Sequence, residues 1–372
     1  MTTMNVPFVD LGRAYQALGH ELDDRLLEVA RGGHYILGPN MAALEAAVAD
    51  YLGLAHAVAV NSGTDALFLA LCAAGIGPGD EVVTTPFTFS ATLGTIEATG
   101  ATPVLVDIEP TSFNIDPKLI EGAVTAATRA ILPVHMFGLP AEMRSVMEIA
   151  SRHGLQVIED CAQSLGARLD GRPAGSFAAL NAFSFYPTKT LGCLGDGGMV
   201  ATADAGLHQS LLSLRNHGAD PEGEYVRQGY NSRLDELQAA VLRVKLERLD
   251  DMNERRRQIA AHYGQELTGL AKLQQASPGA HHVYGYYTIQ VPERDRVRAK
   301  LREAGVATAL YYGKPLHHHP HHARHCRWEA LPVAEEICRH CLSLPIFPEM
   351  TDAEVEYVAA TTARVIREVS GD

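Results

Sequence analysis

Lys189 is the residue of this sequence whose surroundings best suit covalent chemistry. It lies in the stretch FSFYPTKTLGCLGDGGMV, after a predicted strand and Pro187 and ahead of a glycine-rich passage. At the carboxyl end of a strand, the surrounding protein can desolvate a lysine and lower its pKa, and the neutral amine can then form a Schiff base. Taken alone, the same motif is also typical of a surface lysine in a loop.

A carboxylate ends an earlier predicted strand. Asp160 follows the strand at 156–159 in the stretch VIEDCAQSLGA. A carboxylate in this position could keep a pyridine nitrogen protonated, which makes pyridoxal phosphate (PLP) an electron sink. Asp160 and Lys189 would then contact two ends of one cofactor, and Gln163 could bond to the 3-oxygen of its ring. The alternatives are a helix N-cap for Asp160 and a solvated turn residue for Gln163.

The turn at 61–65 (NSGTD) indicates an anion site. It joins a predicted strand at 56–60 to an apolar helix, and the free N–H groups and dipole of such a helix N-terminus attract a phosphate. Gly63 and Thr64 are the candidate phosphate ligands, and the hydroxyl of Ser184 could reach the same phosphate. Helix capping and ordinary strand alternation are the competing explanations.

Two phenylalanines follow the next predicted strand, in TTPFTFSAT. The ring of Phe89 could stack on a pyridine ring, although core packing would also explain it. For Phe87 we prefer core packing.

The elements that must position these residues are βα units on a mostly parallel sheet. Short β-branched runs alternate with helical stretches between residues 55 and 205, which is the pattern of an α/β fold. We expect helices at 66–74 and 141–153, and one that starts at Pro117 with Asp116 as its N-cap. The seven expected strands are 56–60, 81–85, 102–106, 130–134, 156–159, 181–185 and 199–203.

A long periodic segment predicts the junction of two domains. Residues 234–264 contain no proline and place apolar side chains at helical spacing. After it, a strand at 286–291 and helices at 294–305, 333–341 and 351–369 indicate a smaller α+β domain. We therefore divide the chain into a large cofactor-binding domain, 1–250, and a small C-terminal domain, 251–372. Cys338 and Cys341 are interpreted as helical neighbours, because no second cysteine pair stands at zinc-site spacing.

Composition excludes several classes of protein. The chain has 372 residues, 31 Lys and Arg against 44 Asp and Glu, and a formal net charge of -13. This acidity argues against nucleic-acid binding, which depends on cations that neutralise phosphates. The absence of a long apolar run or a signal-like N-terminus predicts a cytoplasmic protein that does not enter membranes, and the six dispersed cysteines are expected to be reduced.

Several separated motifs together resemble the DegT/DnrJ/StrS family of nucleotide-sugar aminotransferases. They are SGTDAL, TPFTFSAT, VIEDCAQSLGA, FSFYPTKTLGCLGDGG, GYNSRLDELQAAVL and SLPIFP, and they extend over nearly the whole chain. The resemblance implies a PLP-dependent transferase of fold type I, the aspartate aminotransferase fold, which acts as a homodimer with shared active sites.

The resemblance also implies the roles of individual residues. Lys189 carries the Schiff base and shuttles protons, and Asp160 faces the pyridine nitrogen. Asn231 reaches the phosphate bound by the partner subunit. The remaining cofactor contacts are Gln163 near the ring oxygen, Phe89 on the ring, and Gly63, Thr64 and Ser184 at the phosphate.

The expected reaction is amino transfer. In a related branch that removes a sugar hydroxyl, histidine replaces the Schiff-base lysine, whereas Lys189 is present here. The resemblance implies L-glutamate as donor and a keto sugar linked to a nucleoside diphosphate as acceptor. The segments HYILGP and LGCLGDGG resemble the branch that acts on 3-keto sugars, so a 3-keto sugar is the acceptor that the resemblance implies. A cyclitol or another keto compound is the alternative acceptor.

Because the protein as a whole is acidic, an anionic substrate must be held by positively charged side chains within the site itself. Arg233, in NSRLD, is the first candidate, although it could instead pair with Asp235 or Glu236. His217 is the second, although a loop histidine is more often solvated. Three further candidates are chosen only from their place in the late loop: Tyr311, Tyr312 and His317.

The histidine-rich segment HHHPHHARH at 317–325 supports a function of another class, that of a metal-binding protein. No carboxylate or cysteine stands at motif spacing to complete a site, and Pro320 stiffens the middle. We therefore expect no functional metal, and we interpret the segment as a source of adventitious binding to a nickel resin.

Overall fold

The computed structural model describes residues 4–371, and an eight-stranded sheet is its largest feature. All neighbouring strands are parallel except at β9, which is antiparallel to both its neighbours. In spatial order the strands are β1 (His56–Val60), β9 (Gly198–Thr202), β8 (Leu180–Ser184), β5 (Gln156–Asp160), β4 (Thr128–Ile131), β2 (Glu81–Thr84), β3 (Thr102–Leu105) and β13 (Arg327–Trp328).

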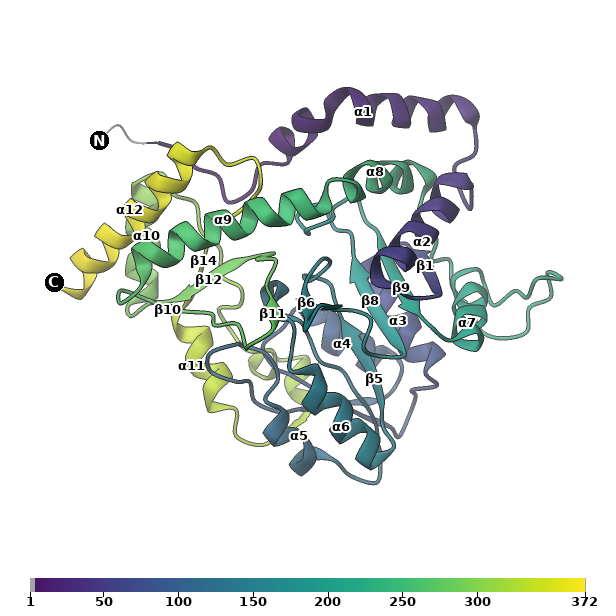
Figure 1. Cartoon of the computed structure of the whole chain (residues 1–372). Coiled ribbons are helices and arrows are strands. Elements are labelled where there is room, and N and C mark those ends of the chain that lie inside the picture. The colour runs from purple at the N-terminus through teal and green to yellow at the C-terminus, as the bar shows by residue number, and fades with distance from the viewer. Residues whose placement is uncertain (1–3, 372) are drawn as a thin grey trace.

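Helices bury both faces of this sheet (Figure 1). Val58 and Val60 of β1 pack into one core cluster, whereas Ala57 and Ala59 pack into another, because successive side chains of a strand point to opposite faces. One face is covered by α3 (Gly63–Ala73), α4 (Ser90–Ala98) and α7 (Ala205–Arg215). The other is covered by α2 (Pro39–Leu52), α5 (Pro117–Ala123), α6 (Met143–His153) and α8 (Glu236–Leu246).

The seven expected strands are all present, with ends that differ by at most three residues. The expected helix at Pro117 is confirmed, with the Asp116 side chain accepting the amide hydrogen of Lys118. The sheet has one strand more than the seven expected. This eighth strand, β13, pairs with β3 at the edge of the sheet. This two-residue strand comes from the late part of the chain, so local sequence patterns could not place it.

The periodic segment at 234–264 folds into two helices. α8 ends at Leu246, Arg248 leaves the helical conformation, and α9 (Leu249–Leu267) begins a new axis. The two helices bury different faces: Leu242 of α8 packs with the large sheet, whereas Tyr263 of α9 packs with the C-terminal core. One straight helix could not serve both cores, so the chain bends between them.

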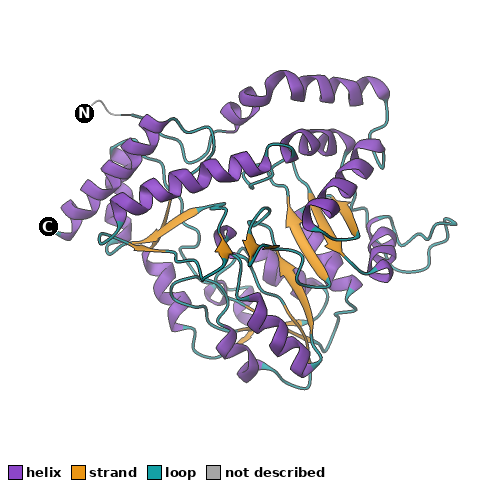
Figure 2. Ribbon diagram, viewed as in Figure 1, coloured by secondary structure: helices purple, strands orange, loops and turns teal. Residues whose placement is uncertain are grey.

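The C-terminal part is the expected α+β unit (Figure 2). Its core joins the sheet to the helices and includes Val6 from the N-terminal segment. The elements are α10 (Arg294–Glu303), α11 (Pro332–His340), α12 (Asp352–Ser370) and an antiparallel sheet of β10 (Lys272–Leu273), β12 (Tyr287–Gln290) and β14 (Cys341–Leu344). Because Val6 packs here and β13 joins the large sheet, the two parts exchange segments, and the division at residue 250 stays a prediction.

Smaller elements complete the described chain. Cys338 ends up in α11 but Cys341 starts β14, so the two are not neighbours on one helix as expected. All six cysteines are free thiols.

None of the helices within residues 4–371 combines the length and apolar character needed to cross a bilayer. The remaining elements are α1 (Leu11–Gly32), β6 (Arg168–Leu169), β7 (Arg172–Pro173), β11 (Ala280–His281) and the short 3-10 turns η1 (Met136–Gly138), η2 (Leu316–His318) and η3 (His322–Arg324).

Candidate active site

Asp160 is the last residue of β5 and is buried at the carboxyl edge of the sheet. One carboxylate oxygen accepts a hydrogen bond from the Thr92 hydroxyl at 2.9 Å, and the other accepts one from the Ala162 amide at 3.1 Å. Burial raises the pKa of Asp160, while these hydrogen bonds and the charge of Lys189 oppose that rise. A turn rather than a helix follows, so the N-cap alternative fails. The carboxylate is held in one orientation where a protonated ring nitrogen would offset its burial.

Lys189 lies in the turn after β8, where its amide donates to the Tyr186 carbonyl at 2.8 Å. Part of the side chain stays accessible to solvent, but burial of the ammonium group among protein atoms lowers its pKa to about 8, against the opposing charge of Asp160. The ammonium nitrogen is 5.8 Å from the centre of the Tyr286 ring. A substantial fraction of this amine is therefore neutral near physiological pH, as a nucleophile requires.

Gln163 links the sheet edge to the late loop. Its amide oxygen accepts the Phe137 backbone N–H at 2.6 Å, and its amide nitrogen donates to the Tyr312 hydroxyl at 3.2 Å. The side chain is buried rather than a solvated turn residue. Burial also raises the pKa of Tyr312 well above its usual value, so this phenol stays protonated.

The start of α3 forms a cradle of small residues beside β8. Ser62 caps the helix by accepting the Asp65 amide at 3.0 Å, and the amides of Gly63 and Thr64 form the open N-terminal end. A Cβ atom on Gly63 would lie 2.5 Å from the Ser184 Cβ, so only glycine lets this helix approach the strand so closely. The capping explanation is confirmed by Ser62, and this cap still leaves the first two amides available to an anion.

Phe87 and Phe89 have different environments, in line with their separate predictions. Phe87 is fully buried in the core, as expected. Phe89 precedes α4 and has 60% of its surface exposed, with its ring at a cavity of about 930 Å³. An exposed aromatic face beside a cavity is available for stacking on a planar ring.

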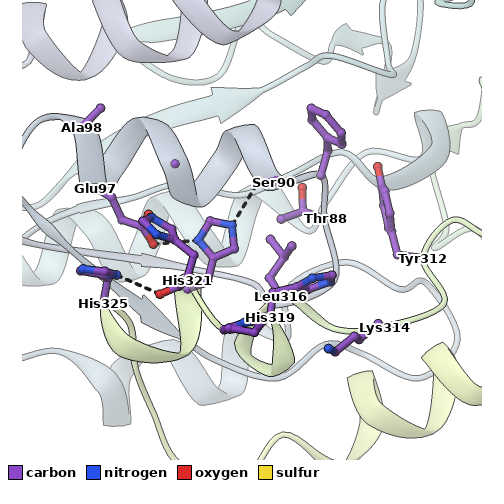
Figure 3. Close-up of a pocket in the computed structure, with 14 residues that line it drawn as sticks. Thr88, Ser90, Glu97, Ala98, Tyr312, Lys314, Leu316, His319, His321 and His325 are labelled. Carbon is purple, nitrogen blue, oxygen red and sulfur yellow. Dashed lines mark hydrogen bonds and ion pairs between the residues drawn. The ribbon is translucent and has the colours of Figure 1, made fainter.

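Two cavities open beside these groups. The cavity of about 930 Å³ lies between α4 and the late loop, and Figure 3 shows Tyr312 at one end of it and His321 and His325 at the other. A second, of about 690 Å³, is lined by Lys189, the start of α1 and α9.

The residues proposed to bind substrate are only partly brought together. A guanidinium nitrogen of Arg233 donates to the Asn216 side chain at 3.3 Å, while its Nε atom is buried with no acceptor among residues 4–371. Glu236 instead accepts the Met41 amide at 2.7 Å, so it is not the partner of Arg233. His217 and Asn231 are exposed, and Asn231 pairs its backbone with that of Asn216.

In the late loop, Tyr311 and His317 contact different parts of the molecule. The Tyr311 ring lies 4.5 Å from that of Tyr286, near the Lys189 turn. His317 is buried 3.2 Å from Glu335, with its ring 5.6 Å from that of Trp328, and it does not line either cavity. We therefore leave His317 out of the substrate contacts proposed below.

Sequence reasoning missed Thr92 and Tyr286. Thr92 follows Phe89 by one helical turn, a spacing that would have placed it on the same side of α4. Its bond to Asp160 nevertheless depends on how α4 packs against β5, for which the sequence carries no local signal. Tyr286 comes from the C-terminal half of the chain and lies near Lys189. No sequence motif indicated that it belongs to the site.

The chain matches known proteins over almost all of its length. Residues 16–363 match the DegT/DnrJ/EryC1/StrS aminotransferase family. A UDP-N-acetyl-3-dehydro-alpha-D-glucosamine 3-aminotransferase of Acidithiobacillus ferrooxidans is 44% identical over 97% of this chain and 98% of that protein. A dTDP-3-amino-3,4,6-trideoxy-alpha-D-glucose transaminase of Streptomyces venezuelae is 46% identical over 94% of this chain and 93% of that protein.

A solved structure has the same fold. The crystal structure of S. venezuelae DesV in complex with a ketimine intermediate superposes with a TM-score of 0.95 at 44% identity, covering 98% of this chain and 99% of that chain. This confirms the expected α/β PLP-dependent transferase fold.

Proposed function

The chain belongs to the DegT/DnrJ/EryC1/StrS aminotransferase family, and we propose that it moves an amino group from L-glutamate onto the 3-keto group of a sugar linked to a nucleoside diphosphate. The two relatives described above carry names that specify 3-amino or 3-dehydro sugars. The product would be an amino sugar for glycan or natural-product biosynthesis.

The observation that carries this proposal is the pairing of Lys189 with Asp160. A lysine whose pKa is lowered to about 8 by burial interacts electrostatically with a buried carboxylate at the end of a neighbouring strand. These two groups fit the two ends of PLP, and the glycine cradle at Gly63 fits its phosphate. When bound, PLP supplies an electron sink for charge that develops at the substrate carbon.

Each of the chain's own residues then has a separate role in the reaction. Asp160, fixed by Thr92, keeps the ring nitrogen protonated, and Phe89 offers a face to the ring. The neutral Lys189 amine takes a proton from the donor's α-carbon and returns one in the second half of the reaction. Gln163, anchored by the Phe137 amide, donates a hydrogen bond toward the ring oxygen.

The proposed acceptor contacts are inferred from the cavity and from a buried guanidinium nitrogen of Arg233. The Nε atom of Arg233 is buried without an acceptor in the described chain, which suits a diphosphate oxygen. Tyr311 and Tyr312 border the space between Lys189 and the larger cavity, and His217 lies on an exposed loop near Arg233. These four are the proposed substrate residues.

We also propose a homodimer, with Asn231 of one subunit contacting the phosphate bound by the other. Large apolar side chains are exposed on the surface, which is typical of surfaces that a partner covers. They are Tyr35, Ile36, Leu37, Tyr186, Leu194, Tyr225 and Val226. A nucleotide-linked substrate and free thiols suit the cytoplasmic location expected from the sequence.

Absorbance spectra of the purified protein test the proposal. We expect a visible band from lysine-bound PLP that L-glutamate removes and that one nucleotide-linked 3-keto sugar restores. Restoration by a 4-keto sugar or a cyclitol ketone would correct the acceptor while leaving the reaction class intact. Failure to bind PLP at all would overturn the proposal.

The dimer has its own test. Analytical ultracentrifugation should give twice the mass of one chain. Mixing inactive Lys189→Ala protein with Asn231→Ala protein should restore part of the activity, because one of the two sites in a mixed dimer then has an intact set. A monomer, or no recovery on mixing, would contradict shared sites.

A further inference from the structure

The exposed half of the histidine-rich segment meets a carboxylate from a distant helix. Glu97, in the last turn of α4, lies beside His321 and His325, with one ligand atom from each within 4.8 Å of the others. The Nε2 atom of His321 is 2.9 Å from a Glu97 oxygen, and the two imidazole rings are 4.7 Å apart. We propose that these three residues bind a Zn²⁺ ion in the wall of the larger cavity (Figure 3).

The hydrogen bonding of His325 prepares it as a ligand. Its Nδ1 atom lies 2.8 Å from the carbonyl oxygen of His321, so Nδ1 carries the hydrogen and Nε2 presents a lone pair. Histidines that bind metals commonly donate their other ring hydrogen to a backbone carbonyl, which fixes both tautomer and ring orientation. His325 therefore has this outer-shell partner already in place.

Glu97 is held by a second pair of contacts. Its other carboxylate oxygen is 2.8 Å from Nδ1 of His322, and Nε2 of His322 is 2.9 Å from the Ser90 hydroxyl. His322 is buried, unlike His321 and His325. His322 is thus a positioning residue: it orients the carboxylate toward the two exposed imidazoles and leaves one oxygen for the ion.

Two other clusters within residues 4–371 have suitable atoms but are weaker candidates. In the first, Glu159 already accepts hydrogen bonds from the Gly175 and Ala178 amides and contacts His135, so its oxygens are occupied in a sealed core. In the second, His317 and His318 share Glu335, but His317 is buried against Trp328. This second cluster provides a control within the same loop.

The ligand set indicates the metal and its role. Two imidazoles and one carboxylate suit Zn²⁺ and leave a coordination position open. All three residues line the cavity, so a ligand inside it can reach that position. The ion would add positive charge on the cavity wall of a protein whose formal net charge is -13, where an anionic ligand could bind. This inference does not depend on the proposed function.

The proposed zinc site departs from the sequence-based expectation of no functional metal. That expectation rested on the lack of a carboxylate at motif spacing. Glu97 lies 224 residues before His321 in the chain and reaches it only because the late loop folds over the end of α4. Sequence spacing cannot report such a contact.

Zinc binding to the full-length, PLP-loaded protein tests the site. After treatment with a chelator and dialysis, titration calorimetry should show one equivalent of Zn²⁺ per chain. His325→Gln and Glu97→Gln should each weaken that binding by at least roughly tenfold, the scale on which outer-shell and ligand changes act. Both His321 and His325 are exposed, so their replacement should leave folding intact.

The matched control is His318→Gln, which removes an exposed histidine of the same loop from the other cluster. It should leave zinc affinity unchanged. Co²⁺ in place of zinc should give the intense visible bands of a tetrahedral site in the wild-type protein but not in His325→Gln. Absence of stoichiometric binding, or equal losses in His318→Gln and His325→Gln, would show adventitious binding by the loop and overturn the site.

Discussion

The strand-end region around Asp160 and the late loop at 311–325 are linked by a hydrogen bond but are held differently. Asp160 is buried, and its oxygens are bonded by a backbone amide and by Thr92. In the late loop, the exposed imidazole of His321 contacts the side chain of Glu97. The two regions meet where Gln163 donates to Tyr312. The carboxylate that we propose for catalysis is thus fixed at the sheet edge, whereas the proposed zinc ligands His321 and His325 lie on an exposed loop.

The comparison predicts the largest effect at Lys189. Lys189→Ala should reduce transamination by at least about a thousandfold and abolish the visible absorbance of bound PLP, because no nucleophile or base replaces the amine. Turnover with L-glutamate and an acceptor sugar measures this. Lys189→Arg is the control: it keeps the charge but not a titratable amine, and it should be equally inactive. Activity in the arginine variant would assign Lys189 a purely electrostatic role.

Asp160→Asn should have the next largest effect. The amide cannot stabilise a protonated ring nitrogen, so turnover should fall by about a hundredfold or more while PLP still binds to Lys189. Single-turnover spectra with L-glutamate separate the two properties. A variant that lost PLP and activity together would instead make Asp160 a structural anchor.

The lowered pKa of Lys189 predicts a pH dependence. PLP attaches to the neutral amine, which predominates above about pH 8. The rate of PLP attachment to the cofactor-free protein should therefore rise about tenfold between pH 7 and 9 and level off at higher pH. Stopped-flow absorbance measures it. A rate still climbing steeply above pH 9 would mean that burial does not lower this pKa.

Thr92→Val should slow turnover by about tenfold, because hydrogen bonds to charged groups contribute about 1.5–3 kcal/mol and this one orients Asp160. The effect should be on kcat rather than on KM for the acceptor, and the absorbance of bound PLP should shift. Thr95→Val is the matched control, since Thr95 lies on the same helix and bonds only to the Thr92 carbonyl. Equal losses in both variants would point to a general disturbance of α4.

Tyr312→Phe should have the smallest effect, because it removes only the acceptor of the Gln163 amide and leaves the ring in place. A neutral hydrogen bond contributes about 0.5–1.5 kcal/mol, so kcat/KM should fall a few-fold. Tyr311→Phe, at the neighbouring position, serves as the control. A loss as large as that in Asp160→Asn would erase the distinction between the two regions.

The same contrast explains what sequence could predict. The strands, the Asp116 cap and the pair Asp160 and Lys189 follow from local patterns, since a residue that ends a parallel strand must lie at the sheet's carboxyl edge. The bend at Arg248 and the edge strand β13 depend on contacts between distant segments. The burial of His317 away from the cavity and the meeting of Glu97 with His321 depend on loop folding. These have no periodic signature.

The short helix α4 has a consequence for redesign. This nine-residue helix begins directly after Phe89. It holds Thr92, which bonds to Asp160, and it ends near Glu97, which contacts the late loop. A substitution that tilts α4 to suit a new acceptor would also disturb Asp160 through Thr92, so catalysis and selectivity would change together. Libraries that seek new acceptors should therefore diversify residues 319–325 and keep α4 constant.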